Sequence, residues 1–330
     1  LTSSSAASDV YKRQVNLNLD LVDSELIPYI ESIPSSAHID WSNIDLVRQQ
    51  SREKREQLAE SLPKIDNVIS KDYFVDIENE RVQLRVYRPK NNSQKLPAVF
   101  WIHGGGFCFG SVDGDDYLVR SMTREIGCVF VSVDYRLAPE YPYPTPLNDC
   151  YAGIEWLFSK ADKLSVDSQR IAVGGISAGG GLAAGLALLI RDKGEFNICF
   201  QALLCPMIDS RNITDSSYLV TDPRIWNRDS NIIAWQHYMG TTECLTSKAI
   251  SKYAAPIFAN DLHDLPSTYI AVGDVDLFLD EDINYSERLE AAGIGIQLEI
   301  FKGGFHAFEF LVPSAKISKL ARANHSSAIS

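Results

Sequence analysis

The sequence predicts an α/β fold in which helices flank a mostly parallel central sheet. The first observation is a change of hydrophobic period. From Tyr73 onwards, apolar residues alternate along residues 73–77 and 82–87, which indicates an antiparallel strand pair. The second observation is the regular alternation of strand-like and helix-like segments that follows. Because parallel strands need crossover connections, this alternation predicts a parallel sheet with helices on both faces.

The elements follow one another in a simple order. Residues 15–70 have an amphipathic, helical pattern, which predicts helices near 24–30 and 46–62. After the first strand pair, strands are expected at 98–102, 128–133, 171–174, 200–205, 268–272 and 296–301. Helices are expected at 117–126, 147–158, 180–191 and 281–292, with a last one after His306.

These elements divide the chain into a core and a helical cap. Residues 1–14 are interpreted as a sequencing or cloning artefact, because 9–14 can be encoded by a transposase adapter. The expected parts are N-terminal cap helices at 15–70, a first core part at 71–208, a cap insertion at 209–250 and a second core part at 251–330. A connection of about 60 residues precedes the strand at 268–272, and connections this long are commonly functional.

Composition and charge exclude some classes of function. The formal net charge is −12, with 45% hydrophobic and 22% charged residues. No basic cluster interrupts this acidity, so we expect no nucleic-acid partner. The longest apolar stretch, 182–190, is too short for a membrane span. The six cysteines lack metal-site spacing, and several lie in apolar runs, which predicts buried free thiols and a cytoplasmic location. The oligomeric state is left open, with a homodimer as one arrangement.

Residues 175–179 form a G-x-S-x-G sequence around Ser177. A β-branched run precedes it, and a helix-like segment of small residues follows. A strand, a serine on a sharp turn and a helix are the surroundings of a nucleophile elbow. The glycines two positions before and after the serine leave room for the strand to pack on the helix. Taken alone, the pattern also fits a glycine-rich phosphate loop or an ordinary turn.

A serine nucleophile needs a base, and the base needs an orienting carboxylate. His306 follows the strand at 296–301, and Asp276 follows the strand at 268–272, in the chain order Ser, Asp, His. Because the carboxyl ends of parallel strands meet at one edge of the sheet, both side chains are expected near Ser177. Asp274 is the alternative acid.

The remaining histidines and the acidic residues after Asp276 are given structural interpretations. His38, His237, His263 and His325 are expected to be solvated. Asp280, Glu281 and Asp282 are expected to place negative charge in the first turn of the helix at 281–292.

An HGGG sequence at 103–106 follows the strand at 98–102. Consecutive glycines let backbone N–H groups point into a site, so this is a candidate oxyanion loop, with a plain glycine turn as the alternative. The N–H of Ala178, at the start of a helix, is a further candidate donor. His103 is expected to brace the loop by hydrogen bonding, and Gly104 is a second supporting residue.

These motifs together resemble the bacterial hormone-sensitive-lipase-like esterases, family IV of the α/β-hydrolases. The resemblance covers about residues 96–308 and rests on the sequences at 103–106, 134–140, 177–180, 276–281 and 306–308. It implies an α/β-hydrolase fold with a helical cap. It further implies Ser177 as nucleophile, His306 as base and Asp276 as orienting acid. The implied oxyanion donors are Gly105, Gly106 and Ala178.

The chain departs from the family pattern at the residue directly before the nucleophile. Many members of the family have Asp directly before the nucleophile, whereas this chain has Ile176. Any hydrogen bond of that Asp must therefore be absent or replaced.

The loop at 135–140 is interpreted as scaffold, because a proline and an Arg–Glu pair suit a fixed turn.

The sequence therefore predicts a serine esterase that cleaves small carboxylic esters through an acyl-enzyme, with no metal or organic cofactor. Amide or carbamate cleavage stays open, since the same machinery serves those bonds. A non-catalytic ligand receptor on the same fold is the alternative class, because a fold does not determine a function.

Overall fold

A computed structural model describes residues 18–77, 80–92, 94–241 and 250–330. The proposed artefact at 1–14 and Cys244 lie outside this part of the chain. No helix among the described residues is both long enough and apolar enough to cross a membrane.

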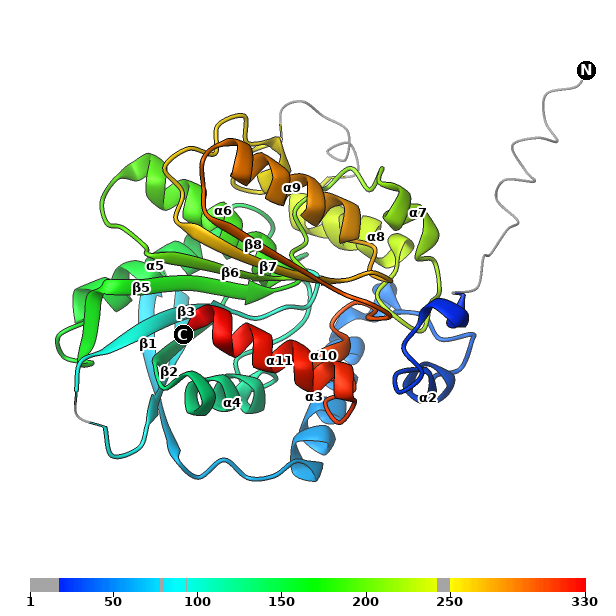
Figure 1. Ribbon diagram of the computed structural model, residues 1–330, viewed down its shortest axis with the longest axis horizontal. Helices are drawn as coiled ribbons and strands as arrows, with labels where there is room; N and C mark the ends of the chain where they lie inside the picture. Colours follow the sequence, from blue (N-terminus) through cyan, green and yellow to red (C-terminus); the bar gives the residue numbers. More distant parts are fainter. Residues whose placement is uncertain (1–17, 78–79, 93, 242–249) are drawn as a thin grey trace, which may run out of the picture.

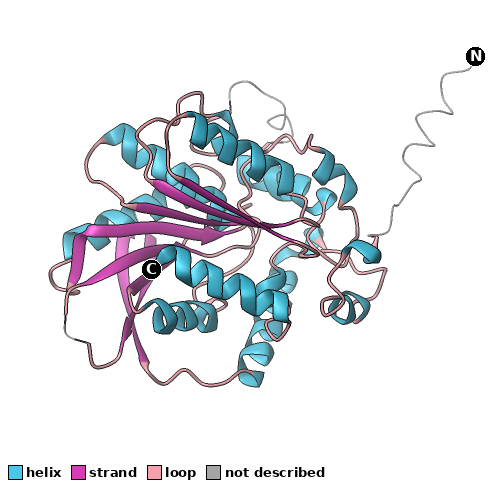
Figure 2. Ribbon diagram, viewed as in Figure 1, coloured by secondary structure: helices cyan, strands magenta, loops and turns pink. Residues whose placement is uncertain are grey.

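The strands of the described chain form one eight-stranded sheet in the order β1-β2-β4-β3-β5-β6-β7-β8 (Figure 2). They are β1 (Val68–Ile77), β2 (Glu80–Pro89), β3 (Leu96–Ile102), β4 (Val129–Asp134), β5 (Val166–Ile176), β6 (Phe200–Leu204), β7 (Ser267–Gly273) and β8 (Ile296–Phe301). The β1–β2 and β2–β4 pairs are antiparallel, and every other neighbouring pair is parallel. This confirms the predicted α/β class and strand positions. The largest differences are that β1 begins at Val68 rather than at 73 and that β5 begins at Val166 rather than at 171.

Helices cover both faces of this sheet (Figure 1). The helices are α2 (Ile27–Glu31), α3 (Ile44–Ser61), α4 (Asp116–Ile126), α5 (Thr145–Lys160), α6 (Ala178–Lys193), α7 (Asp215–Leu219), α8 (Arg228–Met239), α9 (Leu279–Ala291), α10 (Phe308–Leu311) and α11 (Lys316–Ile329), with short 3-10 turns η1 (Leu19–Leu21), η2 (Trp41–Asn43) and η4 (Pro256–Phe258). On one face lie α5, α6 and α9, and on the other lie α4 and α11. Parallel strands covered on both faces are apolar throughout, which explains why β4 and the second half of β5 are almost wholly buried.

The N-terminal segment and the insertion between β6 and β7 meet over the carboxyl end of the sheet. Tyr29 of α2 stacks on Phe305, with ring centres 5.9 Å apart. Trp41 packs against Phe109 and against His237 of α8, at 5.4 Å in both cases. Both segments therefore cover the edge where the candidate active site was expected. The exact boundaries at 15–70 and 209–250 stay a prediction.

Three expectations about individual side chains are wrong. His237 was expected to be solvated, but it is half-buried, because α8 packs it against Trp41. His325 was expected to be solvated, but it is 3% exposed, because α11 packs it against Tyr269 and Phe301. Cys199 is an exposed free thiol, because it lies in the loop that leads into β6. The thiols of Cys108, Cys128, Cys150 and Cys205 are free and buried, as predicted.

Candidate active site

Ser177 lies on the sharp turn between β5 and α6. Its backbone has φ 57° and ψ −123°, a conformation that costs a non-glycine residue energy and is held by the packing around it. A Cβ on Gly175 would lie 2.4 Å from the Gly179 carbonyl oxygen, and one on Gly179 would lie 2.1 Å from that of Ile102. Both glycines are therefore required for the close packing of β5, α6 and the end of β3.

The structure brings the three predicted triad side chains together. His306 Nε2 lies 2.9 Å from Ser177 Oγ, and His306 Nδ1 lies 2.8 Å from Asp276 Oδ2. The second Asp276 oxygen accepts a hydrogen bond from the Phe278 amide at 3.0 Å. Ser177, Asp276 and His306 are 5%, 1% and 6% exposed. Because these residues follow β5, β7 and β8, the parallel strands deliver all three to one edge of the sheet.

The other acidic residues of this region have different partners. Asp274 accepts a hydrogen bond from the Gly303 amide at 2.6 Å and is not in the triad contact. Asp280 caps α7 by accepting from the Ser216 amide at 2.7 Å. Glu281 and Asp282 lie in the first turn of α9, as predicted, but they are buried, at 2% and 0% exposed. Glu281 accepts from the amides of Ile208 and Asp209.

The HGGG loop lies directly beside Ser177. A Cβ on Gly104 would be 3.4 Å from the Ser177 Cβ, so the loop and the elbow are in contact. Gly105 and Gly106 have φ values of 126° and 57°, which glycine adopts without strain. Ala178 is the first residue of α6, and the first amides of a helix have no partner within it.

His103 lies against the glycine loop, held by ring stacking and a hydrogen bond. Its ring is wholly buried, stacks on Tyr135 at 4.2 Å, and donates from Nδ1 to the Gly104 carbonyl at 2.9 Å. The Tyr135 hydroxyl in turn donates to the His103 carbonyl at 3.2 Å. Burial lowers the pKa of His103, which favours the neutral ring. These contacts hold the His103 ring against the glycine loop, and its supporting role stays a prediction.

The loop at 135–140 is held by ion pairs, although not by the expected Arg–Glu pair. Arg136 pairs with the buried carboxylate of Asp149 on α5 at 2.6 Å. Glu140 pairs instead with Arg48 of α3 at 2.8 Å. Arg136 and Glu140 do not pair with each other, because their side chains face different neighbouring helices, α5 and α3.

Ile176, at the position where many relatives have Asp, is 6% exposed. Its Cγ2 would be 3.3 Å from a Cβ on Gly104. An apolar contact with the glycine loop therefore replaces any hydrogen bond that an acid would make there.

Cys205 is a neighbour of the triad that the sequence analysis missed. It follows β6 directly, has φ 35° and is 3% exposed. Its sulfur and the ligating atoms of Asp276 and His306 all lie within 4.8 Å of one another, a donor set that zinc accepts. However, burial and the nearby Asp276 raise the pKa of the thiol well above its usual value, which disfavours the thiolate that a metal needs. Its position at a strand end was the signal that could have found it.

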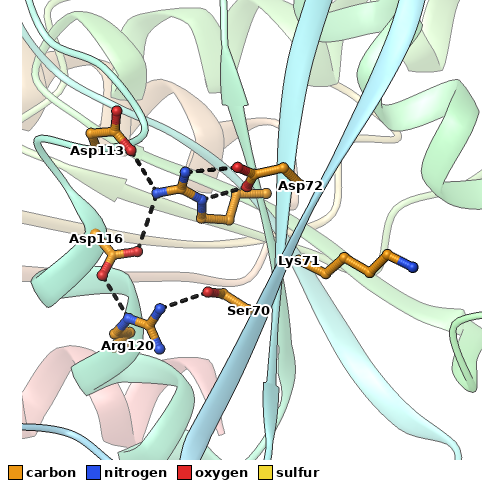
Figure 3. Close-up of a pocket in the computed structure, with 7 residues that line it drawn as sticks. Ser70, Lys71, Asp72, Asp113, Asp116 and Arg120 are labelled. Atoms are coloured by element: carbon orange, nitrogen blue, oxygen red, sulfur yellow. Dashed lines mark hydrogen bonds and ion pairs between the residues drawn. The ribbon is translucent and has the colours of Figure 1, made fainter.

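A polar hollow of about 440 Å³ lies elsewhere, on β1, β2 and the start of α4 (Figure 3). It is lined by Ser70, Lys71, Asp72, Arg85, Asp113, Asp116 and Arg120. Arg85 donates to Asp72 at 2.6 and 2.9 Å, and Arg120 donates to Asp116 at 2.6 Å, whereas Lys71 extends away from this group. Because carboxylates already engage both guanidinium groups, we interpret this cluster as the attachment of α4 to the β1–β2 hairpin.

Comparisons with known proteins agree with this fold. A family model of the alpha/beta hydrolase fold matches residues 99–310. Esterase LipI of Mycobacterium tuberculosis is 32% identical over 299 residues, covering 89% of this chain and 91% of that protein. Carboxylesterase NlhH of the same species is 35% identical over 239 residues, covering 71% and 74%. A solved bacterial heroin esterase superposes with a TM-score of 0.88 at 35% identity, covering 94% of this chain and 98% of that one.

Fold and matches together define an α/β-hydrolase. The chain belongs to the hormone-sensitive-lipase-like, family IV esterases of that superfamily, and its enzyme class is carboxylic ester hydrolase.

Proposed function

We propose that this chain cleaves small carboxylic esters through an acyl-enzyme, with Ser177 as nucleophile, His306 as base and Asp276 as orienting acid. The observation that carries the proposal is the continuous hydrogen-bond chain from Ser177 Oγ through both His306 nitrogens to Asp276. A receptor would not need a serine hydroxyl placed 2.9 Å from a histidine that a buried carboxylate orients.

In the first half of the reaction, Ser177 Oγ attacks the ester carbonyl and gives its proton to His306 Nε2. Asp276 accepts from His306 Nδ1–H, which selects the tautomer with a free Nε2 and stabilises the imidazolium that forms. His306 then donates the proton to the leaving alcohol, and the acyl group remains on Ser177. In the second half, water attacks, His306 takes its proton, and the acid leaves with Ser177 Oγ protonated again.

The negative charge on the carbonyl oxygen is assigned to the amides of Gly105, Gly106 and Ala178. The glycine loop in contact with the Ser177 turn, and the helix that starts at Ala178, support this assignment. Removal of one such donor typically costs roughly 2.7–4 kcal/mol in the barrier.

Replacement of the nucleophile tests the proposal. Ser177→Ala is expected to lower kcat for p-nitrophenyl acetate and butyrate by about 10⁶-fold, the loss seen when a triad nucleophile is removed. Labelling by a fluorophosphonate probe should disappear as well. Ser286→Ala is the matched control, because Ser286 is also 5% exposed but lies on α9 and donates to the Ile283 carbonyl. Near-normal turnover by a folded Ser177→Ala protein would contradict the proposed mechanism.

A further inference from the structure

Trp226 lies over the glycine loop of the candidate active site. It comes from the insertion between β6 and β7, just before α8, and is half-buried. A Cβ built on Gly106 would lie 2.4 Å from the indole Cη2 and 2.9 Å from Cζ2, so the six-membered ring of the indole contacts this loop. Its ring centre is 6.5 Å from that of His306. The indole therefore lies close both to the proposed base and to the loop of the proposed oxyanion donors.

A chain of buried amides holds the indole in this orientation. Trp226 Nε1–H donates to Asn231 Oδ1 at 3.1 Å, and Asn231 Nδ2 donates to Asn212 Oδ1 at 2.5 Å. Asn212 Nδ2 then donates to the Ser210 carbonyl at 3.1 Å. Asn231 and Asn212 are only 1% and 2% exposed. Because buried amides keep their partners, the indole is a fixed wall of the site.

The start of α8 is fixed in the same way. Asn227 caps the helix by accepting from the Ser230 amide at 3.0 Å, and its Nδ2 donates to the carbonyls of Asp222 and Ile225 at 3.1 Å. The turn that carries Trp226 is therefore closed on both sides of the indole, which limits its movement when a substrate enters.

The neighbours of the indole indicate which part of a substrate it meets. In the tetrahedral intermediate, the reacting carbon carries Ser177 Oγ, the oxyanion, the leaving oxygen and the acyl group. The oxyanion faces the amides at Gly105 and Gly106, and the leaving oxygen must lie near His306 Nε2 to receive its proton. A side chain that contacts the loop at Gly106 and also lies near His306 is therefore close to the edge shared by these two oxygens. The acyl group points away from that edge.

We propose that Trp226 limits the size of the alcohol part of the substrate, so that the site accepts esters of small alcohols and discriminates against bulky ones. This inference rests on the proposed function and deepens it, because it names the substrate group that the cap inspects. Trp226 is a specificity-determining residue here, since it meets the substrate without transferring a proton.

A series of acetate esters isolates the alcohol side. Every acetate gives the same acetyl-enzyme, so differences in kcat/KM between acetates arise only in binding and acylation. Trp226→Ala is expected to raise the ratio of kcat/KM for 1-naphthyl acetate over ethyl acetate by about tenfold or more, the scale of a steric change in an apolar pocket. The ratio of p-nitrophenyl octanoate over p-nitrophenyl acetate should change by less than that, because these esters vary only the acyl group.

Two further variants make the outcome decisive. Trp226→Phe retains a flat ring and should keep most of the discrimination between the two acetates. Trp156→Ala is the remote control, because Trp156 is also half-buried but packs on Tyr73 at 5.1 Å, away from the triad. An unchanged alcohol ratio in Trp226→Ala, or a shift confined to the acyl series, would overturn this inference. If Ser177→Ala is inactive in the same assays, such a result leaves the proposed function intact.

Discussion

Asp276 and Asp274 are two residues apart, but the structure gives them different partners. The first meets His306 Nδ1, whereas the second accepts from the Gly303 amide in the loop before His306. From the sequence alone both were candidates for the orienting acid. The choice depends on which carboxylate faces the imidazole after the turn that follows β7, and that is decided by the local backbone and not by spacing.

Substitution of each aspartate tests this assignment. Asp276→Asn is expected to lower kcat for p-nitrophenyl acetate by about 10⁴-fold, because an amide favours the wrong histidine tautomer. Asp274→Asn should keep most of the activity, since its Oδ1 remains able to accept from the Gly303 amide. Equal losses in the two variants, measured with both proteins folded by circular dichroism, would refute the distinction.

At the scale of elements, Arg48 fastens α3 to the core, alongside the ion pair of Arg55 with Asp115. Arg48 donates to both Glu140 oxygens at 2.8 Å, and to the carbonyls of Cys108 and Ala138 at 2.9 Å each. The first carbonyl lies just beyond the glycine loop. The Arg48 guanidinium therefore couples α3, the loop at 135–140 and the segment that carries the proposed oxyanion donors.

Arg48→Lys is expected to destabilise the protein by about 1–3 kcal/mol, because an ammonium cannot satisfy the carboxylate and both carbonyls together. Urea unfolding measures the change, with Arg52→Lys at an exposed position of α3 as control.

The Arg48–Glu140 pair also makes the stability depend on pH. Arg48 lowers the pKa of Glu140, so the pair stabilises the fold above the usual glutamate pKa, and this stabilisation is lost as pH falls through the pKa of Glu140 in the folded protein. The difference between wild type and Arg48→Lys should therefore shrink in acid. A difference that is constant down to pH 3 would contradict this role.

At the scale of the whole molecule, the candidate active site is assembled from segments that are distant in sequence. Several buried acidic side chains lie close to it. Asp282 is wholly buried on α9, and neither carboxylate oxygen has a hydrogen-bond partner among the described residues. Burial, together with the charges of Glu281 and Asp276, raises the pKa of Asp282 well above its usual value. Such a group opposes folding once the pH is high enough to ionise it in the unfolded chain.

Asp282→Asn is therefore expected to stabilise the protein at neutral pH. The folded pKa is raised, so the stability of the wild type is fully present below the ordinary aspartate pKa of about 3.9 and is lost as pH rises toward the folded value. The asparagine variant does not lose this stability, because its side chain does not ionise. Thermal melts should show a higher Tm for the variant at pH 7–8 and no gain near pH 3.5. A Tm difference that does not depend on pH would show that Asp282 is not held in its neutral form.

Patterns in the sequence predicted the α/β class, the approximate strand positions and the residues that could form the triad. Hydrophobic periodicity is a local property of the sequence. The rule that the carboxyl ends of parallel strands share one edge of the sheet is topological. Both can therefore be applied without coordinates. Ser177, Asp276 and His306 each follow a strand, and this placement, together with the G-x-S-x-G motif and the chain order Ser, Asp, His, predicted their meeting.

Which side chains surround that site depends on tertiary packing. The burial of His325, the pairing of Arg136 with Asp149, the place of Cys205 beside the triad and the position of Trp226 over Gly106 all depend on contacts between distant segments. Such contacts arise when helices and loops pack against the finished sheet. No pattern within one segment carries information about the partner that packing will supply.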